Sequence, residues 1–264
     1  MRGLPDFPPF ATDWSIVELV SEKAQGRVWR VRRPTPQGWQ WGYFKYAGPE
    51  HRYYAGPMVA NEWLAAAILR RLRLPAARVV PARIGELEGI VSVAPEAETV
   101  RQWRELEPKE RARHLRLFRR PSGLYGMIVF DIWTTNIDRG RGKNLIVYRR
   151  PGERKYRYRL IDHALALHGS YYKWDHYGPW RGRSWQRPWR VYHAPEGLKP
   201  TARRLRPWVR RIQALPASWL ERLVRSVPRR FLSRREAAFI TRLLIVRQRQ
   251  LHRLVRRWLR HYRR

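Results

Sequence analysis

The sequence contains no cysteine among its 264 residues. This absence excludes disulfide bonds, thiolate zinc sites and cysteine nucleophiles, and it fits a protein of the reducing cytosol. Long apolar runs are also missing, because the longest such segment of note, residues 63–69, is far shorter than a membrane span. The first residues lack the apolar stretch of a signal peptide. We therefore expect a cytoplasmic protein without a transmembrane span.

Acidic residues and lysine are both scarce. The chain has 21 Asp and Glu against 56 Lys and Arg, which gives a formal net charge of +35, and only seven of the basic residues are lysine. A surface this positive attracts polyanions such as nucleic acid, anionic membranes or acidic proteins. The arginines are spread over the whole chain, so a general compositional bias accounts for most of them. The charge alone therefore selects no partner.

Hydrophobic residues make up 44% of the chain, which suffices for a substantial core. Residues 1–12 are rich in proline and are predicted to be irregular. Residues 13–97 form a first predicted unit, in which β-strands surround one buried helix at 57–72. Its predicted strands lie at 15–20, 27–32, 39–47, 77–84 and 89–93.

Residues 98–264 form a second, mostly helical unit after a connector at 94–98. Two short strands are predicted within it, at 144–148 and 155–161. Its predicted helices cover 99–119 with a break at Pro108, 121–133, 207–215, 217–227 and 233–262, the last starting at a capping box of Ser233 and Glu236. Strands followed by helices indicate the α+β class.

A polar loop at 134–144 separates an apolar helix from a buried strand, and loops held in this way often carry chemistry. It contains Asp138 and ends at Asn144, where the strand begins. A second apolar strand ends at Asp162. Two aspartates and one asparagine beside buried strands could together form a site for a metal ion and for phosphoryl transfer.

Two charged residues of the first unit lie on apolar elements. Lys45 ends an apolar strand in a chain that otherwise prefers arginine, and a compact ammonium suits a phosphate group as a point charge. The alternative is a lysine that only reaches out to solvent. Glu62 shares a helical stripe with apolar residues and therefore needs a partner, either Lys45 or the positive end of the helix dipole.

The aromatic and arginine-rich segment 168–195 is not expected to form regular structure. Its tryptophans are Trp174, Trp180, Trp185 and Trp189. Interleaved arginine and tryptophan could bind nucleic acid or an acidic peptide. The alternative is a long loop packed by its own rings. The helix at 233–262 is also rich in arginine, and it is expected to dock with its apolar stripe inward.

Several of these segments together resemble the catalytic core of the HipA-like kinases and, more distantly, that of type II phosphatidylinositol 4-kinases. The matching segments are VFDIWTTNIDR (129–139), NLIV (144–147) and LIDH (160–163), supported by YFK (43–45) and NE (61–62). The resemblance spans nearly the whole chain. It implies a two-lobed protein-kinase-like fold with a small β-rich N-lobe carrying one main helix, a larger helical C-lobe, and ATP between the lobes.

For the nucleotide, the resemblance implies that Lys45 contacts the phosphate groups and pairs with Glu62. The turn from Ser21 to Gly26 would take the place of the phosphate-covering loop of the family. With only one glycine, this turn matches the family poorly, and an ordinary turn is the alternative.

For catalysis, the resemblance implies that Asp138 accepts the proton of the acceptor, while Arg139 orients the loop or meets a phosphate group. Asn144 and Asp162 would hold Mg²⁺. The loop has one residue more between Asp138 and Asn144 than is usual in the family. Either the loop absorbs the extra residue and Asn144 keeps its place, which we favour, or Lys143 replaces the asparagine and damages the metal site.

The expected activity is an ATP- and Mg²⁺-dependent phosphoryl transfer to an unidentified acceptor, for which a protein Ser or Thr is one candidate. A catalytically weak or inactive module that binds nucleic acid or acidic partners is the first alternative. A lipid kinase of the phosphatidylinositol type is the second. The sequence does not identify the acceptor.

Overall fold

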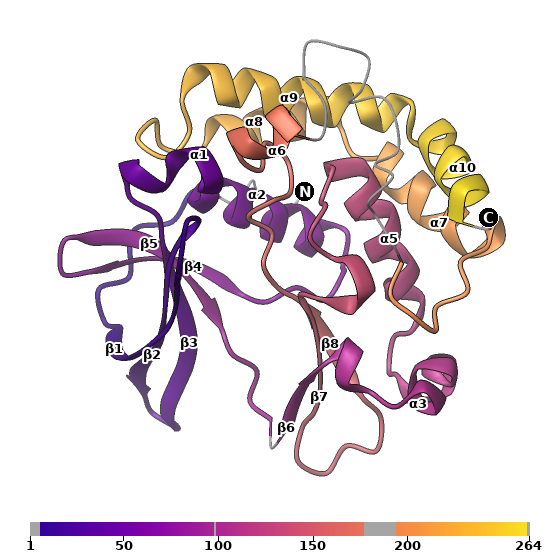
Figure 1. Cartoon of the computed structure of the whole chain (residues 1–264), viewed down its shortest axis with the longest axis horizontal. Helices are drawn as coiled ribbons and strands as arrows, with labels where there is room; N and C mark the ends of the chain where they lie inside the picture. The colour runs from indigo at the N-terminus through magenta and orange to yellow at the C-terminus, as the bar shows by residue number, and fades with distance from the viewer. Residues whose placement is uncertain (1–5, 98, 177–193, 263–264) are drawn as a thin grey trace.

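The computed structural model describes residues 6–97, 99–176 and 194–262 (Figure 1). A five-stranded antiparallel sheet of order β1-β2-β3-β5-β4 forms the N-terminal part. Its strands are β1 (Ser15–Lys23), β2 (Gly26–Thr35), β3 (Gly38–Tyr46), β4 (Val79–Ile84) and β5 (Leu87–Val93). Between β3 and β4 the chain forms η1 (Pro49–His51), α1 (Arg52–Ala55) and α2 (Met58–Arg71).

The rest of the described chain is mostly helical, apart from an antiparallel sheet of β6 (Thr99–Gln102), β7 (Leu145–Arg149) and β8 (Arg157–Leu160). Figure 1 shows the larger sheet on one side of the molecule and most helices on the other. The predicted α+β arrangement is therefore confirmed. The remaining elements are η2 (Trp103–Glu105), α3 (Pro108–Ala112), α4 (His114–Leu117), α5 (Ser122–Thr134), η3 (Gly140–Gly142), α6 (Tyr171–His176), α7 (Ala202–Gln213), α8 (Ala217–Arg225), α9 (Arg234–Arg249) and α10 (Leu251–Tyr262).

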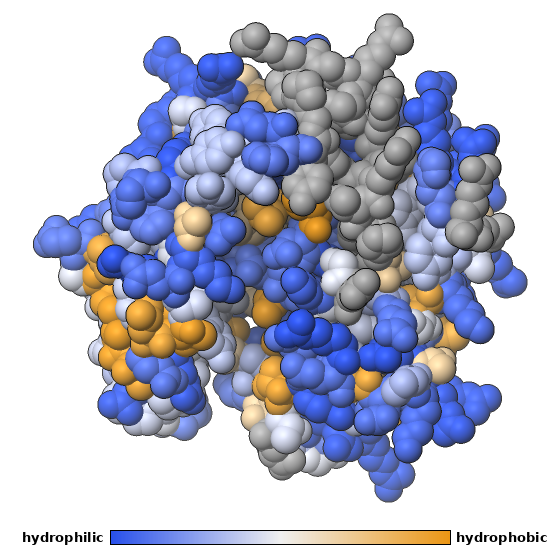
Figure 2. Space-filling model, viewed as in Figure 1, coloured by the Kyte–Doolittle hydropathy of each residue, from blue (hydrophilic) through white to orange (hydrophobic). Residues whose placement is uncertain are grey.

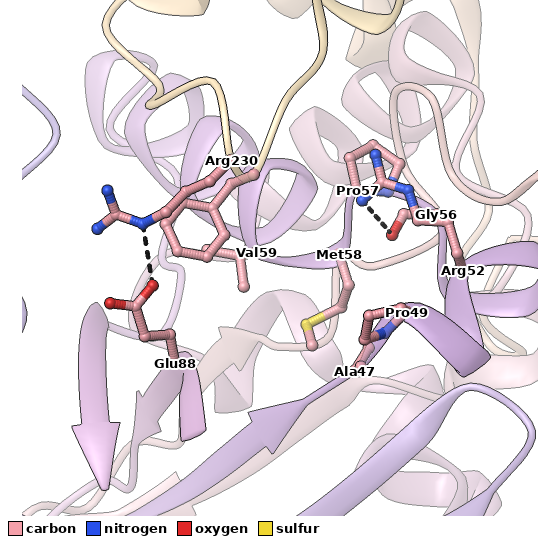
Figure 3. Close-up of a pocket in the computed structure, with 11 residues that line it drawn as sticks. Ala47, Pro49, Arg52, Gly56, Pro57, Met58, Val59, Glu88 and Arg230 are labelled. Atoms are coloured by element: carbon pink, nitrogen blue, oxygen red, sulfur yellow. Dashed lines mark hydrogen bonds and ion pairs between the residues drawn. The ribbon is translucent and has the colours of Figure 1, made fainter. Parts of the chain in front are cut away.

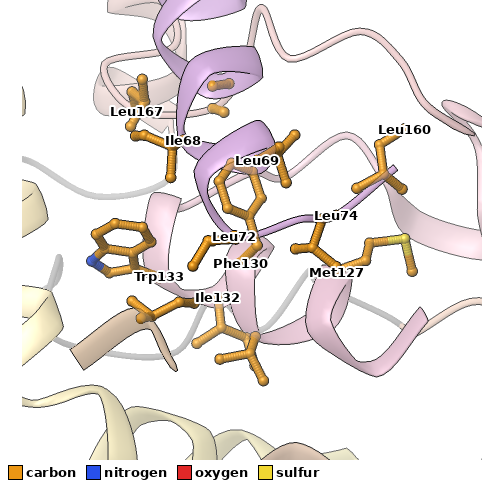
Figure 4. Packing of buried hydrophobic residues seen from close by; sticks show 14 of the residues in the cluster. Ile68, Leu69, Leu72, Leu74, Met127, Phe130, Ile132, Trp133, Leu160 and Leu167 are labelled. Atoms are coloured by element: carbon orange, nitrogen blue, oxygen red, sulfur yellow. The ribbon is translucent and has the colours of Figure 1, made fainter. Parts of the chain in front are cut away.

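The main core is built on α2 and α5, whose side chains are buried on nearly every face. Figure 4 shows Leu69 of α2 and Leu72, which caps that helix, beside Phe130 of α5, and all three are fully buried. Burying a side chain of this size contributes about 1.5–3 kcal/mol. Because α5 is fixed in this way, the loop that follows it starts from a rigid position.

The segment predicted as a helix at 99–119 is different in the structure. Residues 99–102 form strand β6, which pairs with β7 from Thr99 opposite Arg149 to Gln102 opposite Ile146. Only the short helices η2, α3 and α4 follow. The prediction was wrong here because a short strand that completes a sheet gains its stability from a distant partner, which local helix propensity does not report.

Three further helix predictions need correction. The helix expected at 233–262 begins at the predicted capping box but is divided at Gln250 into α9 and α10. Helix α7 starts at Ala202, where Thr201 caps it, so Pro207 lies inside the helix instead of at its start. Helix α6 lies within the segment 168–195 that was predicted to be irregular. Residues 177–193, with three of the four tryptophans singled out there, lie outside the described residues.

Exposed apolar side chains gather over the edge strand β1, where Figure 2 shows them as one patch on a largely hydrophilic surface. They are Ile16, Val17, Leu19 and Val20. Val17 and Val20 fall at two irregularities of the β1–β2 register. Bulges of this kind interrupt the regular edge that another strand would need for pairing.

Candidate active site

A pocket of about 430 Å³ lies where the β1–β2 hairpin, the start of α2 and the loop after α5 meet. Six of the eight predicted site residues line it, and these are Ser21, Gly26, Lys45, Asp138, Asn144 and Asp162. The other two, Glu62 and Arg139, are buried and do not belong to its lining. The structure therefore brings together residues that are far apart in the sequence.

Lys45 lies at the end of β3 between two carboxylates. Its Nζ is 2.5 Å from Oε1 of Glu62 and 2.9 Å from Oδ1 of Asp162. Burial would lower the pKa of Lys45, but the charges of Asp162 and Glu62 outweigh it and raise the pKa. Burial would likewise raise the pKa of Asp162, yet Lys45 keeps that pKa below its usual value. Lys45 is therefore a fixed positive charge at the wall of the pocket.

Glu62 is the anchor of this arrangement and is only 2% exposed. While Oε1 contacts Lys45, Oε2 accepts a hydrogen bond of 2.9 Å from the backbone N–H of His163. Burial raises the pKa of Glu62, and Lys45 offsets part of that effect. The predicted partner of Glu62 is thus present, and a second contact from the chain after β8 adds to it.

Asp138 and Asn144 face each other across the loop. The side-chain amide of Asn144 donates to Oδ2 of Asp138 at 2.9 Å and to its carbonyl oxygen at 3.1 Å. Asn144 and Asp162 both have a φ of 54°, a left-handed conformation that Asn and Asp tolerate better than most residues. Burial, reinforced by the charge of Asp162, raises the pKa of Asp138.

The loop between Asp138 and Asn144 contains the turn η3. Gly142 in this turn has a φ of 79°, and a Cβ atom there would lie 2.5 Å from Cδ1 of Trp103. A side chain is therefore excluded, and the glycine lets the loop pack closely on the tryptophan. Asn144 lies next to Asp138, and Lys143 also lines the pocket.

Arg139 lies under the loop and is fully buried. Its Nε is 2.9 Å from Oδ2 of Asp131, and its Nη1 donates to the carbonyl oxygens of Asn144 and Ile161. Its Nη2 lies 3.1 Å from Nδ1 of His163. Of the two expected roles, this geometry supports orientation of the loop. It does not support contact with a phosphate group.

The segment expected to fold over a phosphate group is a tight hairpin instead of a loop. Strand β1 continues to Lys23, which pairs with Gly26, so the turn contains only residues 24 and 25. Gly26 has a φ of 117°, and a Cβ atom there would lie 2.2 Å from the carbonyl oxygen of Tyr46. The glycine is thus needed for close packing. Ser21 and Gly26 still line the pocket.

Comparisons with known proteins agree with this architecture. No protein-family model and no curated protein matches the sequence. Among solved structures, the chain is similar to the proinflammatory kinase CtkA of Helicobacter pylori, with a TM-score of 0.64, 12% identity, and 93% of this chain and 96% of that chain covered. The chain has a protein-kinase-like fold. The two-lobed, protein-kinase-like fold expected from the sequence is confirmed at this level.

Two further structures are similar to a lower degree. One is HipA of Shewanella oneidensis MR-1, from a complex with HipB and operator DNA, with a TM-score of 0.47, 12% identity, and 100% of this chain and 68% of that chain covered. The other is the PknI kinase domain of Mycobacterium tuberculosis, in a double mutant, with a TM-score of 0.32, 16% identity, and 92% of this chain and 100% of that chain covered.

Two residues beneath the candidate site were not predicted. Asp131 of α5 accepts from Arg139 and from the amide of Asn136, and it is 1% exposed. Its signal in the sequence was an acid inside an apolar helix, which requires a partner. His163 follows Asp162 and is buried against Arg139. Burial and that neighbouring charge hold the pKa of His163 well below its usual value.

The oxygen atoms of Asp138, Asn144 and Asp162 are the donor set available for a cation between the lobes. Carboxylate and amide oxygens are the ligands that Mg²⁺ accepts, usually together with phosphate oxygens and water. The two carboxylates also act on each other, because the charge of Asp162 raises the pKa of Asp138. The residues present therefore fit Mg²⁺. In the described part of the chain, no group of three or more His, Cys, Asp or Glu forms a metal site by itself.

A second pocket of about 350 Å³ lies at the N-terminal end of α2 and is lined by residues of both lobes (Figure 3). It is closed by Arg230 of the C-lobe, whose Nε is 2.9 Å from Oε2 of Glu88 in β5. Only Met58 lines both pockets, and none of the predicted site residues lines this one. No helix among the described residues is long and apolar enough to cross a bilayer.

Proposed function

We propose that this protein is an ATP- and Mg²⁺-dependent kinase that transfers the γ-phosphoryl group of ATP to an acceptor hydroxyl. One observation carries the proposal. A single pocket in a protein-kinase-like fold is lined by Lys45, Asp138, Asn144 and Asp162, with Lys45 held from behind by Glu62.

The nucleotide phosphates would lie between Lys45 and the β1–β2 hairpin. The Nζ of Lys45 already has a fixed position, so a phosphate group meets a preorganised charge and no side chain has to be ordered for it. Ser21 and Gly26 line the same wall and can approach the phosphates with a hydroxyl and with backbone, respectively.

Asp138 would accept the proton of the attacking hydroxyl. The Asn144 amide holds one carboxylate oxygen of Asp138, which orients the other toward the acceptor. Transfer forms a bond from the acceptor oxygen to the γ-phosphorus, breaks the bond from that phosphorus to the bridging oxygen, and releases ADP. Such transfers depend mainly on positioning and on neutralisation of charge.

Asn144 and Asp162 would hold Mg²⁺, with Asp138 nearby. When bound, the ion neutralises charge on the phosphate oxygens and fixes their orientation. Arg139 supports both ligands indirectly, because its guanidinium binds the carbonyl oxygens of Asn144 and Ile161, the latter next to Asp162.

The proposal is tested with purified protein, Mg²⁺ and radiolabelled ATP. We expect nucleotide binding and phosphoryl transfer to the protein itself or to an added acceptor. Lys45→Met should weaken nucleotide binding, and Asp138→Asn should abolish transfer while nucleotide still binds. Lys199→Met, at an exposed site outside the pocket, is the matched control. Protein that binds no nucleotide, or an Asp138→Asn variant with unchanged transfer, would refute the proposal.

A non-catalytic module that binds polyanions is the alternative, and the net charge of +35 favours it. It predicts binding to nucleic acid that weakens steeply with salt and does not depend on Asp138. Nucleotide binding that persists at high salt supports the kinase instead. Protein and inositol-lipid acceptors in the same transfer assay separate a protein kinase from a lipid kinase.

A further inference from the structure

Four exposed rings gather beside the mouth of the candidate active site. They belong to Tyr53 and Tyr54 of α1 and to Tyr172 and His176 of α6, and we call them the α1–α6 ring cluster. Tyr54 itself lines the pocket that contains Asp138, Asn144 and Lys143. The cluster therefore begins at the site of phosphoryl transfer and leads away from it along the protein surface.

The rings of the cluster are in contact with one another. The centroids of Tyr54 and Tyr172 are 5.3 Å apart, and those of Tyr172 and His176 are 3.8 Å apart in a stacked arrangement. Tyr53 packs edge-on against Tyr54 at 4.9 Å, and its hydroxyl donates to Asp175. The cluster is thus an ordered row of rings.

Despite these contacts, the row is open to solvent. Tyr53, Tyr54 and Tyr172 are 41%, 39% and 36% exposed. Most large aromatic side chains of the described chain lie in the core or are partly covered, so three neighbouring tyrosines with this exposure are not explained by packing alone. A row of exposed ring faces is a surface on which other flat rings stack.

The pocket next to this row has positive charge that the site itself does not neutralise. Lys45 is engaged by two carboxylates, and Arg27 pairs with Glu22. Lys23 and Lys143 also line the pocket, and in the described parts of the chain neither lies within 4.0 Å of a carboxylate oxygen. One site thus combines ring faces with cations that are available to anionic groups.

We infer that the phosphoryl acceptor is a hydroxyl group of single-stranded nucleic acid, whose bases stack on the α1–α6 ring cluster while its phosphate groups contact Lys143 and Lys23. The inference rests on the proposed kinase function. Every nucleobase offers a flat face and every nucleotide carries a negative charge, so an unpaired strand matches both features at once. A serine peptide requires no row of rings, and an inositol headgroup has no aromatic face to stack.

The chemistry of the transfer step is the one given above. The nucleic-acid hydroxyl oxygen forms the new bond to the γ-phosphorus, the bond to the bridging oxygen breaks, and its electron pair leaves with ADP. The hydroxyl proton goes to Asp138. The product is a phosphorylated strand with one more phosphate monoester.

The test uses the full chain with Mg²⁺ and radiolabelled ATP. The acceptors are a mixed-sequence single-stranded RNA, the DNA of the same sequence, the matching duplexes, a mixture of unfolded Ser- and Thr-containing proteins, and vesicles containing phosphatidylinositol. We expect label on the single strands and much less on the duplexes. Tyr54→Ala and Tyr172→Ala should each raise the KM for the oligonucleotide about 10-fold. The KM for ATP should be nearly unchanged in Tyr172→Ala, because Tyr172 does not line the pocket.

Two further variants make this test specific. Tyr54→Phe keeps the ring and should retain a wild-type KM for the oligonucleotide. Tyr262→Ala removes a tyrosine of similar exposure, 37%, that stacks on Trp258 at the end of α10 and should have no effect. Thermal unfolding of each variant shows that it is folded.

Label on protein or lipid but not on oligonucleotides would overturn the inference and leave the proposed function in place. An unchanged KM for the oligonucleotide in both alanine variants would overturn it as well. If the chain binds no nucleotide and labels no acceptor, the proposed function fails and this inference fails with it.

Discussion

The carboxylate of Glu62 joins Lys45 to the backbone of His163, with contacts of 2.5 Å and 2.9 Å from its two oxygens. One buried side chain of α2 therefore fixes both the lysine that faces the pocket and the chain next to Asp162. Both walls of the pocket depend on the position of this single helix.

Glu62→Gln should keep the fold but loosen both contacts, because a neutral amide holds an ammonium group less tightly than a carboxylate does. Misplacement of a catalytic group by about 1 Å costs roughly 100-fold in rate, so we expect kcat/KM to fall by about that factor. Steady-state kinetics measures kcat/KM for the variant and for the wild type. Glu221→Gln is the control, since Glu221 forms an exposed pair with Arg225 outside the pocket. Equal activity of the two variants would contradict the role given to Glu62.

Arg139→Met should strongly destabilise the protein. It leaves the carboxylate of Asp131 buried without its cation, a change that costs about 3–5 kcal/mol in buried pairs. Denaturant unfolding measures the loss. The double variant Asp131→Asn with Arg139→Met should lose less than the sum of the two single changes, because the pair is removed together. Additive losses would show that Arg139 and Asp131 act independently. Arg225→Met, at an exposed helix site, should have little effect.

The parts of the fold that could be predicted are those with a local signal. Helices α2 and α5 are continuous apolar segments, and the hairpin strands β1 to β3 follow one another with short turns, so pattern alone located them. Strand β6 and the break at Gln250 have no such signal, since the first depends on pairing with β7 and the second on how α9 and α10 pack.

The candidate site likewise contains residues that have a local signal in the sequence and residues that have none. Glu62 was identified because burial of a charge requires a partner. Lys45 and Asp162 were identified as charged residues at the ends of apolar strands, and Lys45 also because lysine is scarce in this chain. The true position of Arg139 was not predictable. Whether an arginine next to a loop aspartate points into the pocket or beneath the loop depends on three partners from distant elements, Asp131, Ile161 and His163.

Asp138→Asn should stabilise the protein at neutral pH. A carboxyl group whose pKa is raised by folding binds its proton more tightly in the folded than in the unfolded state, so the ionised form opposes folding once the pH exceeds the raised pKa. The amide removes this penalty. The difference in Tm between variant and wild type should therefore be positive at pH 7 and should shrink as the pH falls through that pKa. A lower Tm of the variant at pH 7 would contradict the raised pKa.

The pKa of Glu236 is shifted in the opposite direction to that of Asp138, so ionised Glu236 should stabilise the folded protein. Burial would raise its pKa, but hydrogen bonds from Ser233 and the charge of Arg52 outweigh this and lower the pKa. Its contribution to stability is therefore present above its unfolded pKa and is lost as the pH falls through the lower folded pKa. Glu236→Gln should reduce the free energy of unfolding at pH 7 by about 2 kcal/mol, with a smaller effect in acid. Glu221→Gln, next to Arg225, is the exposed control.

The contacts between α5 and α9 connect the site to the order in which the chain is synthesised. Arg247 of α9 is fully buried and donates to the carbonyl oxygens of Ile132 and Trp133, at the end of α5, while the indole N–H of Trp133 donates to the carbonyl of Leu244. The carbonyl groups that lack a helical partner at the end of α5, just before the loop of the candidate site, thus accept hydrogen bonds from a residue far downstream. We expect a nascent chain that has not yet released α9 from the ribosome to lack a settled loop between α5 and β7, so that the candidate site forms only after α9 has emerged.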